Sequence, residues 1–284
     1  MNLAYTLFRF KNQVNSIMRP RNTAQKMARL FLSPNQRPLK AWEHQAEQAG
    51  QRFQINEQVS AIRWLPATTN QGQPKRILLV HGWESRATQM YGLVPDLLAL
   101  GFEVTALDMP LHGHSKGHQA NPYVFAQTIL LAQQELGEFE GVIAHSMGAA
   151  ATAFSLSNGL NTQKVILVAG PSCIANTLHH FAGLMGLNNK TTRYFLEEIE
   201  KTVGIPSEQL DVLAGKQDIS IPILVVHDET DREIPFSESQ RMVSAFSQGE
   251  LLATQGLGHR KIIKSDIFKE KMLSFFAHLP QVKV

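Results

Sequence analysis

The sequence predicts an α/β fold with a mostly parallel, doubly wound sheet. Short apolar runs alternate along the chain with longer segments of helical composition, the order found when helices flank a parallel sheet. The runs at 77–80 and 223–226 are apolar at every position, as expected of strands buried on both faces. Polar loops follow these runs, at the edge where active sites of such sheets lie.

Composition limits the class of protein. The 284 residues are 43 % hydrophobic and can fill a sizeable core, while the net charge of +3 does not indicate a nucleic-acid partner. A single cysteine, Cys173, excludes an internal disulfide framework and fits a reducing compartment. With no apolar run long enough to span a membrane and no secretory leader, we expect a cytoplasmic protein.

The first 42 residues carry eight basic side chains and no acidic one. Apolar residues at helical spacing predict an amphipathic first helix: Leu3, Leu7, Phe10, Val14 and Ile17. We expect this helix to end at Pro20 and to cover the domain, with its basic face in water. An anionic membrane surface is the alternative partner of such a helix. Further helices at 22–32 and 39–50 complete an N-terminal helical extension, residues 1–50, packed on the domain.

Strand patterns begin after residue 50. Alternating residues at 53–55 and 59–65 predict an antiparallel hairpin at a sheet edge. After a polar linker at 67–75, the expected strands are 77–80, 102–107, 142–143, 165–168, 223–226 and 251–254. The expected helices are 87–100, 121–136, 147–157, 237–246 and 265–278, with a strand-free helical segment at 172–220.

Ser146 joins a short buried strand to an alanine-rich helix. So tight a turn strains the backbone and leaves little room two residues away, where Ala144 and Gly148 stand. It lifts the hydroxyl clear of the sheet and places it at a helix N-terminus, which stabilises negative charge. Ser146 is therefore the candidate nucleophile, although an incidental serine between strand and helix is the alternative.

A serine nucleophile needs a base, an acid that orients the base, and donors for the oxyanion. His259, in a glycine-rich loop before the last helix, is the candidate base. The candidate acid is Asp231; its competitor Asp228 lies too close to the strand end to reach His259. The order Ser, Asp, His is the one expected on this topology. The backbone N–H groups of Met147 and Trp83 are the candidate oxyanion donors.

The other histidines have structural interpretations. His81 is expected to hold its own loop, and His112 and His114 to fix the turn after Asp108. The spacing of His112, His114 and His118 is too loose to indicate a metal site, and no carboxylate or cysteine cluster accompanies them. We expect neither a metal nor an organic cofactor.

Five short motifs occur in order along the chain: His81-Gly82, the segment 108–115, the segment 144–148, the segment 227–235, and Gly258-His259. They resemble the oxyanion loop, the Asp-x-x-x-His-Gly-x-Ser loop, the nucleophile elbow, the acid loop and the catalytic histidine loop of the α/β-hydrolase superfamily. The resemblance runs from about Phe53 to the end. It implies an α/β-hydrolase domain at 51–284 and places the acid on Asp231. Ala144 and Asp228 depart from the family pattern, each standing where a glycine is usual.

In this family the insertion after the sixth strand is a lid, which implies a helical lid at 172–220. Its apolar side chains either line a pocket or pack the lid onto the domain. The candidate substrate-binding residues are Trp83, His145, Phe181 and Met185. Trp83 would crowd the oxyanion side and favour modest substrates.

The expected function is hydrolysis of small carboxylic esters through an acyl-enzyme by a Ser-His-Asp triad. A thioesterase, a C–C bond hydrolase or a cofactor-free perhydrolase would use the same triad. A ligand-binding protein without turnover is an alternative of another class. A lipid hydrolase held at a membrane surface by the basic N-terminal segment is the remaining alternative.

Overall fold

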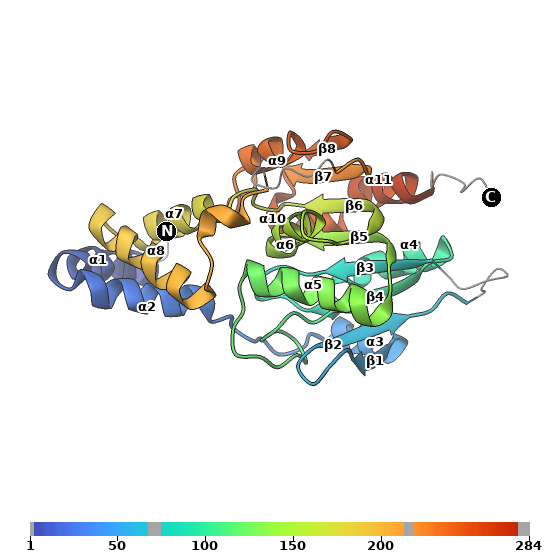
Figure 1. The fold of residues 1–284 in the computed structure, drawn as a ribbon, viewed down its shortest axis with the longest axis horizontal. Helices are drawn as coiled ribbons and strands as arrows, with labels where there is room; N and C mark the ends of the chain where they lie inside the picture. The colour runs from blue at the N-terminus through green and yellow to red at the C-terminus, as the bar shows by residue number, and fades with distance from the viewer. Residues whose placement is uncertain (1–2, 68–74, 213–218, 278–284) are drawn as a thin grey trace.

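Eight strands form a single sheet in the computed structural model, which describes residues 3–67, 75–212 and 219–277. The order of the strands is β1-β2-β4-β3-β5-β6-β7-β8 (Figure 1). The hairpin of β1 (Gln51–Gln54) and β2 (Ser60–Trp64) is antiparallel and forms one edge. The remaining strands are parallel: β3 (Arg76–Val80), β4 (Glu103–Leu107), β5 (Phe139–His145), β6 (Thr162–Val168), β7 (Ile223–Asp228) and β8 (Gly249–Thr254).

Helices cover both faces of this sheet, so the predicted fold class is confirmed. One face carries α5 (Pro122–Leu136), α6 (Met147–Leu156) and α9 (Phe236–Val243). The other carries the 3-10 helix η1 (Ala87–Leu93), α4 (Val94–Ala99) and α11 (Asp266–Ala277). Strand side chains alternate between two cores, with Leu78 in the first and Leu79 in the second. The described residues leave out most of the linker expected at 67–75 and part of the helical segment expected at 172–220. They also leave out the last residue of the helix expected at 265–278.

Proline explains two differences from the predicted helix boundaries. The helix expected at 87–100 is a 3-10 helix followed by a short α-helix that has Pro95 in its first turn. α1 (Leu3–Met18) ends just before Pro20, as expected, but α2 (Pro20–Leu32) begins at Pro20 itself and not at residue 22. Because proline lacks an N–H, it fits the first turn of a helix, where that donor has no partner. His259, expected in a loop, lies in the short helix α10 (Gly258–Lys261).

A separate helical group gathers beyond one end of the sheet, at the left of Figure 1. It combines α1 and α2 with two helices that follow β6, α7 (Ile174–Met185) and α8 (Asn189–Val203). Met27 of α2 is buried with Leu178 of α7 and Phe195 of α8. The third N-terminal helix, α3 (Ala41–Ala49), instead lies at the antiparallel edge, where Trp64 donates its indole N–H to the Ala46 carbonyl at 3.1 Å. None of the helices in the described ranges combines the length and apolar character needed to cross a membrane.

The apolar stripe of α1 faces away from the protein, against our expectation for a cover helix. Leu3 is 73 % exposed and Ile17 is 77 % exposed. The buried side chains of α1 are the polar Asn12 and Ser16. Helical periodicity identifies two faces but does not say which one is buried, and here polar contacts to α7 and α8 decide.

Candidate active site

Ser146 stands between β5 and α6 with a strained backbone. Its φ of 56° and ψ of −123° are unusual for a residue with a side chain. The backbone of neighbouring segments comes very close to this turn. A Cβ at position 148 would lie 2.5 Å from the His81 carbonyl oxygen, and one at position 82 would lie 2.7 Å from Cβ of Ser146. Glycine at these two positions lets the turn seat the hydroxyl against the loop that follows β3.

Three side chains from distant parts of the chain meet here in one hydrogen-bonded line. Oγ of Ser146 lies 2.9 Å from Nε2 of His259, and Nδ1 of His259 lies 2.7 Å from Oδ2 of Asp231. A carboxylate can only accept, so in the neutral imidazole Nδ1 carries the proton and Nε2 accepts from the hydroxyl. His259 is therefore oriented to take a proton from Ser146.

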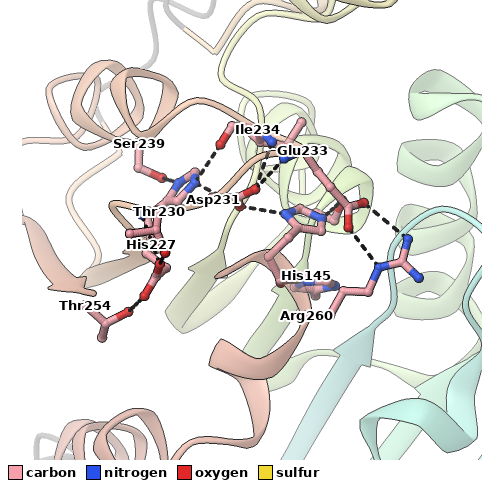
Figure 2. A network of polar contacts seen from close by, with 12 residues as sticks. His145, His227, Thr230, Asp231, Glu233, Ile234, Ser239, Thr254 and Arg260 are labelled. Carbon is pink, nitrogen blue, oxygen red and sulfur yellow. Dashed lines mark hydrogen bonds and ion pairs between the residues drawn. The ribbon is translucent and has the colours of Figure 1, made fainter. Parts of the chain in front are cut away.

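Asp231 has more hydrogen-bond partners than His259 alone. Its Oδ1 accepts from the N–H groups of Glu233 and Ile234, at 2.7 and 3.0 Å. Its Oδ2 also lies 3.1 Å from Nε2 of His227 (Figure 2). Burial raises the pKa of Asp231, but the hydrogen bonds from His227 and His259 outweigh it and hold the pKa well below its usual value. The acid is thus ionised at neutral pH.

His227 was missed as a site residue in the sequence analysis, although it opens the acid-loop motif. Its ring is fully buried at the end of β7. Nε2 lies 3.1 Å from the Ile234 carbonyl oxygen as well as near Asp231, and Nδ1 lies 2.5 Å from Oγ of Ser239. Both neighbours of Nε2 are acceptors, so Nε2 donates and Nδ1 accepts the Ser239 hydroxyl. His227 orients the acid as the acid orients His259.

Asp228, the competing acid, is engaged elsewhere. Its Oδ2 accepts from Oγ1 of Thr254 at 2.8 Å and from the N–H of Leu257 at 2.9 Å, and Oδ1 accepts from the Thr230 N–H at 3.0 Å. Burial raises the pKa of Asp228, but hydrogen bonds from the Thr230 hydroxyl, the backbone of Leu257 and Gly258 and the Thr254 hydroxyl together bring it well below its usual value. The carboxylate thus ties the acid loop to the loop that carries His259.

The two candidate oxyanion donors belong to segments that adjoin Ser146. Met147 is the first residue of α6, so its N–H has no acceptor within the helix. Trp83 follows the Gly82 that approaches Ser146. His81 fixes this loop because its Nδ1 donates to the Gly82 carbonyl at 2.7 Å and its Nε2 accepts the Met109 N–H at 3.0 Å. Burial holds the pKa of His81 well below its usual value, so the ring is neutral.

His145 supports the short helix that carries His259 through a hydrogen bond to its backbone. Its Nε2 lies 2.9 Å from the His259 carbonyl oxygen, which can only accept. Burial, with the neighbouring His259, lowers the pKa of His145 to about 4. The ring is therefore a neutral donor at physiological pH and adds no charge next to the base.

A cavity of about 270 Å³ opens onto Ser146 and His259. Its walls come from the N-terminal segment before and at the start of α3, the loop after β3, and the segment around α10. The lining residues are Arg37, Pro38, Lys40, Trp42, Glu43, Gly82, Trp83, Glu84, Ser85, Arg86, Gln89, Met90, His145, Ser146, Glu233, His259, Arg260, Ile263 and Lys264. The first fifty residues thus supply a wall of the candidate site, which the sequence did not indicate.

The four candidate substrate-binding residues divide into two pairs. Trp83 and His145 line the cavity, whereas Phe181 and Met185 are absent from its lining. Phe181 packs with Phe195 in the helical group and meets the ring of Phe31 edge-on at 5.0 Å. Phe31 in turn stacks on Trp83 at 6.4 Å. Phe181 therefore reaches the site through Phe31 of α2.

Positive charge exceeds negative charge on the cavity wall. Glu43, Glu84 and Glu233 each lie within 4 Å of an arginine on the same wall, Arg86, Arg37 and Arg260 respectively. Lys40 and Lys264 remain without a lining carboxylate, and Lys264 lies over the Trp42 ring at 4.5 Å. Within the described ranges, no three His, Cys, Asp or Glu side chains are grouped so that they could hold a metal ion.

Solved structures with the same fold are similar over most of this chain. Est1E of Butyrivibrio proteoclasticus superposes with a TM-score of 0.61 at 14 % identity, covering 81 % of this chain and 98 % of its own. The esterase Pf2001 of Pyrococcus furiosus has a TM-score of 0.59 at 20 % identity, covering 86 % and 96 %. A 2-hydroxy-6-oxo-6-phenylhexa-2,4-dienoate hydrolase of Rhodococcus sp. strain RHA1 has a TM-score of 0.58 at 17 % identity, covering 80 % and 98 %.

No sequence match was found among curated proteins. The alpha/beta hydrolase family, however, matches residues 77–263, well over half of the sequence and the whole span from β3 to the His259 helix. Family match, strand order and superposed structures agree, and the chain belongs to the alpha/beta hydrolase family.

Proposed function

We propose that this protein is a serine hydrolase that cleaves carboxylic esters through an acyl-enzyme. The observation that carries the proposal is the continuous line from Ser146 through His259 to Asp231, with distances of 2.9 and 2.7 Å. The lowered pKa of Asp231 keeps it ionised, and an ionised acid stabilises the imidazolium that forms on His259 during attack.

The chemistry follows from these contacts. Nε2 of His259 takes the hydroxyl proton as Oγ of Ser146 bonds to the ester carbonyl carbon. The N–H groups of Met147 and Trp83 donate to the oxyanion. His259 then gives the proton to the leaving alcohol oxygen as the ester C–O bond breaks. Water, activated by the same imidazole, attacks the acyl carbon and restores Ser146.

The cavity supports a small substrate. Its volume of about 270 Å³ falls below the ~300–1,000 Å³ of typical ligand pockets, so short acyl and alcohol parts fit best. Lys40 and Lys264 leave an excess of positive charge, which favours an ester that carries a negative group.

A second candidate is C–C bond hydrolysis with the same triad. One structure of this fold is named as the hydrolase of a dienoate, an anionic compound. The positive cavity wall is the observation that favours a carboxylate-bearing substrate here. Thioesterase and perhydrolase activities have no comparable feature in their favour.

Covalent labelling with a fluorophosphonate tests the proposal. We expect the wild type to be labelled and Ser146→Ala to remain unlabelled at unchanged melting temperature. Turnover on a panel of p-nitrophenyl esters should be fastest for short acyl chains and should fall by about four orders of magnitude or more in Ser146→Ala. A folded wild type that neither labels nor cleaves any ester would favour a ligand-binding protein instead. Hydrolysis of a dienoate in preference to esters would favour the second candidate.

A further inference from the structure

Helix α1 presents an apolar surface to solvent along its whole length. Six large side chains make up this stripe: Leu3, Leu7, Phe10, Val14, Ile17 and Met18. Every one is at least 40 % exposed, and they outnumber the large exposed apolar residues on all other described elements together. Isolated exposed apolar side chains are ordinary, but a contiguous stripe of this kind marks an interaction surface.

Polar contacts on the opposite side fix this orientation. Asn12 donates its amide to the Met185 carbonyl at 3.2 Å, and the Ser16 carbonyl accepts from Nδ2 of Asn188 and Oγ1 of Thr191, at 3.1 and 3.0 Å. At about 100° per residue, Asn12 lies about 180° around the helix from Leu3. Turning the stripe inward would break these contacts and bury the exposed charges of α1, so the stripe is the outer face of the folded protein.

The segment that carries the stripe is rich in positive side chains and has no acidic one. Arg9 and Lys11 lie on α1, and Arg19, Arg21, Lys26 and Arg29 follow in the linker and α2. Lys11 lies about 80° from Leu3, at the margin of the stripe. Among the ion pairs of the described residues, none uses these six side chains, and the first 42 residues contain no acid.

We propose that α1 docks the protein on an anionic phospholipid bilayer. The stripe would enter the boundary between headgroups and acyl chains with the helix axis parallel to the membrane, and the basic side chains would lie at the phosphates. The charge pattern argues against a second copy as the occupant. Two-fold pairing of the stripe would bring together two copies of a helix that carries Arg9 and Lys11 and no acidic residue to offset them.

Vesicle flotation tests this surface. One set of vesicles contains phosphatidylglycerol and phosphatidylcholine, and the other contains phosphatidylcholine alone. We expect the wild type to bind the anionic set at least tenfold more strongly, and 0.5 M salt to weaken this binding severalfold because it screens the charges. Leu7→Gln/Phe10→Gln should bind at least tenfold more weakly than wild type. Leu100→Gln/Ile267→Gln, which changes exposed apolar residues elsewhere, should bind as wild type does.

Three outcomes would overturn the proposal. One is equal vesicle binding by the stripe variant and its control. Another is vesicle binding that ignores lipid charge and salt. The third is a wild-type dimer in light scattering that the stripe variant dissociates, with no vesicle binding. Melting temperature shows that each variant is folded, and a Phe10→Trp variant should shift its fluorescence to the blue on anionic vesicles.

Membrane docking is independent of the proposed ester chemistry. Ser146→Ala should bind vesicles as wild type does, and hydrolysis of p-nitrophenyl acetate is measured without vesicles. Failure of either proposal is thus distinguishable from failure of the other.

Discussion

Helices α6 and α1 differ in how firmly their surroundings hold them. Eight of the ten residues of α6 are buried, and its Gly148 lies against the backbone of the loop that follows β3. Only two of the sixteen residues of α1 are buried, and both are polar. α6 is seated by close backbone packing at the proposed catalytic edge, whereas α1 is held by a few polar contacts and by the half-buried ring of Phe8. The difference predicts that equivalent substitutions in the two regions have unequal effects.

The largest expected effect is a loss of activity, and it distinguishes the two buried carboxylates at the proposed catalytic edge, Asp231 and Asp228. Asp231→Asn should lower kcat/KM for an ester by about 10⁴-fold. The N–H groups of Glu233 and Ile234 hold the amide oxygen, so the NH2 group faces Nδ1 of His259 and donates to it, which stabilises the wrong tautomer of the imidazole. Asp228→Asn should lower it less than tenfold and instead cost about 1–3 kcal/mol of unfolding free energy, since it weakens hydrogen bonds from Thr254 and Leu257.

Ester kinetics and urea unfolding of both variants make this comparison. Equal loss of activity in the two variants at unchanged stability would remove the assignment of Asp231 as the acid.

A pair of glycine substitutions compares the packing of α6 with that of α7, a helix of the same group as α1. Gly148→Ala should destabilise the protein by about 3 kcal/mol, because the new Cβ would lie 2.5 Å from the His81 carbonyl oxygen and 2.8 Å from that of Val80. Gly183→Ala in α7 places its Cβ in open space, with no atom within 4 Å, and should stabilise by about 0.5–1 kcal/mol through helix propensity. Urea unfolding should show opposite signs, and shifts of the same sign would contradict the argument.

The same contrast explains what the sequence could predict. Continuous apolar runs predicted β3, β6 and β7 because a strand buried on both faces leaves no other pattern. The motifs predicted that Ser146, Asp231 and His259 meet at one edge of the sheet, because each motif follows the carboxyl end of a predicted strand.

The rest depends on contacts that no local pattern encodes. The wall formed by Lys40 and Trp42 comes from packing of the N-terminal segment across the site. His227 carried a signal in its motif, but its bond to Asp231 is visible only once the loop has folded. The stripe of α1 was recognised, yet its direction was set by Asn12 and partners on α7 and α8.

Acidification should lower the free energy of unfolding, because of a histidine at the proposed catalytic edge. The pKa of His145 falls to about 4 in the folded protein, against a usual 6.5, because the ring is buried. The unfolded chain then binds a proton that the folded chain does not, so stability is lost as pH falls from about 6.5 toward 4. His145 alone should cost about 2 kcal/mol between pH 7 and pH 5, and the buried His81 acts in the same direction.

Urea unfolding at several pH values measures this loss. His145→Gln keeps a donor for the His259 carbonyl without titrating, so its stability should fall less on acidification than that of wild type. His180→Gln on the exposed side of α7 is the matched control and should follow wild type. A His145→Gln curve that parallels wild type would show that another group carries the pH dependence.

The smallest expected effect is on the local stability of α1, where replacing an apolar residue should cost less than replacing a polar one. Phe10→Gln should change local stability of α1 by less than about 0.5 kcal/mol, because the ring is 64 % exposed. Asn12→Ala should cost about 1 kcal/mol, since it removes the amide that donates to the Met185 carbonyl. Tryptic cleavage after Arg9 and Lys11 reports local opening of the helix, and should rise about fivefold in Asn12→Ala and stay within about twofold of wild type in Phe10→Gln. Because both variants leave the sheet untouched, their melting temperatures should match wild type, and faster cleavage of Phe10→Gln than of Asn12→Ala would mean that the stripe packs inward after all.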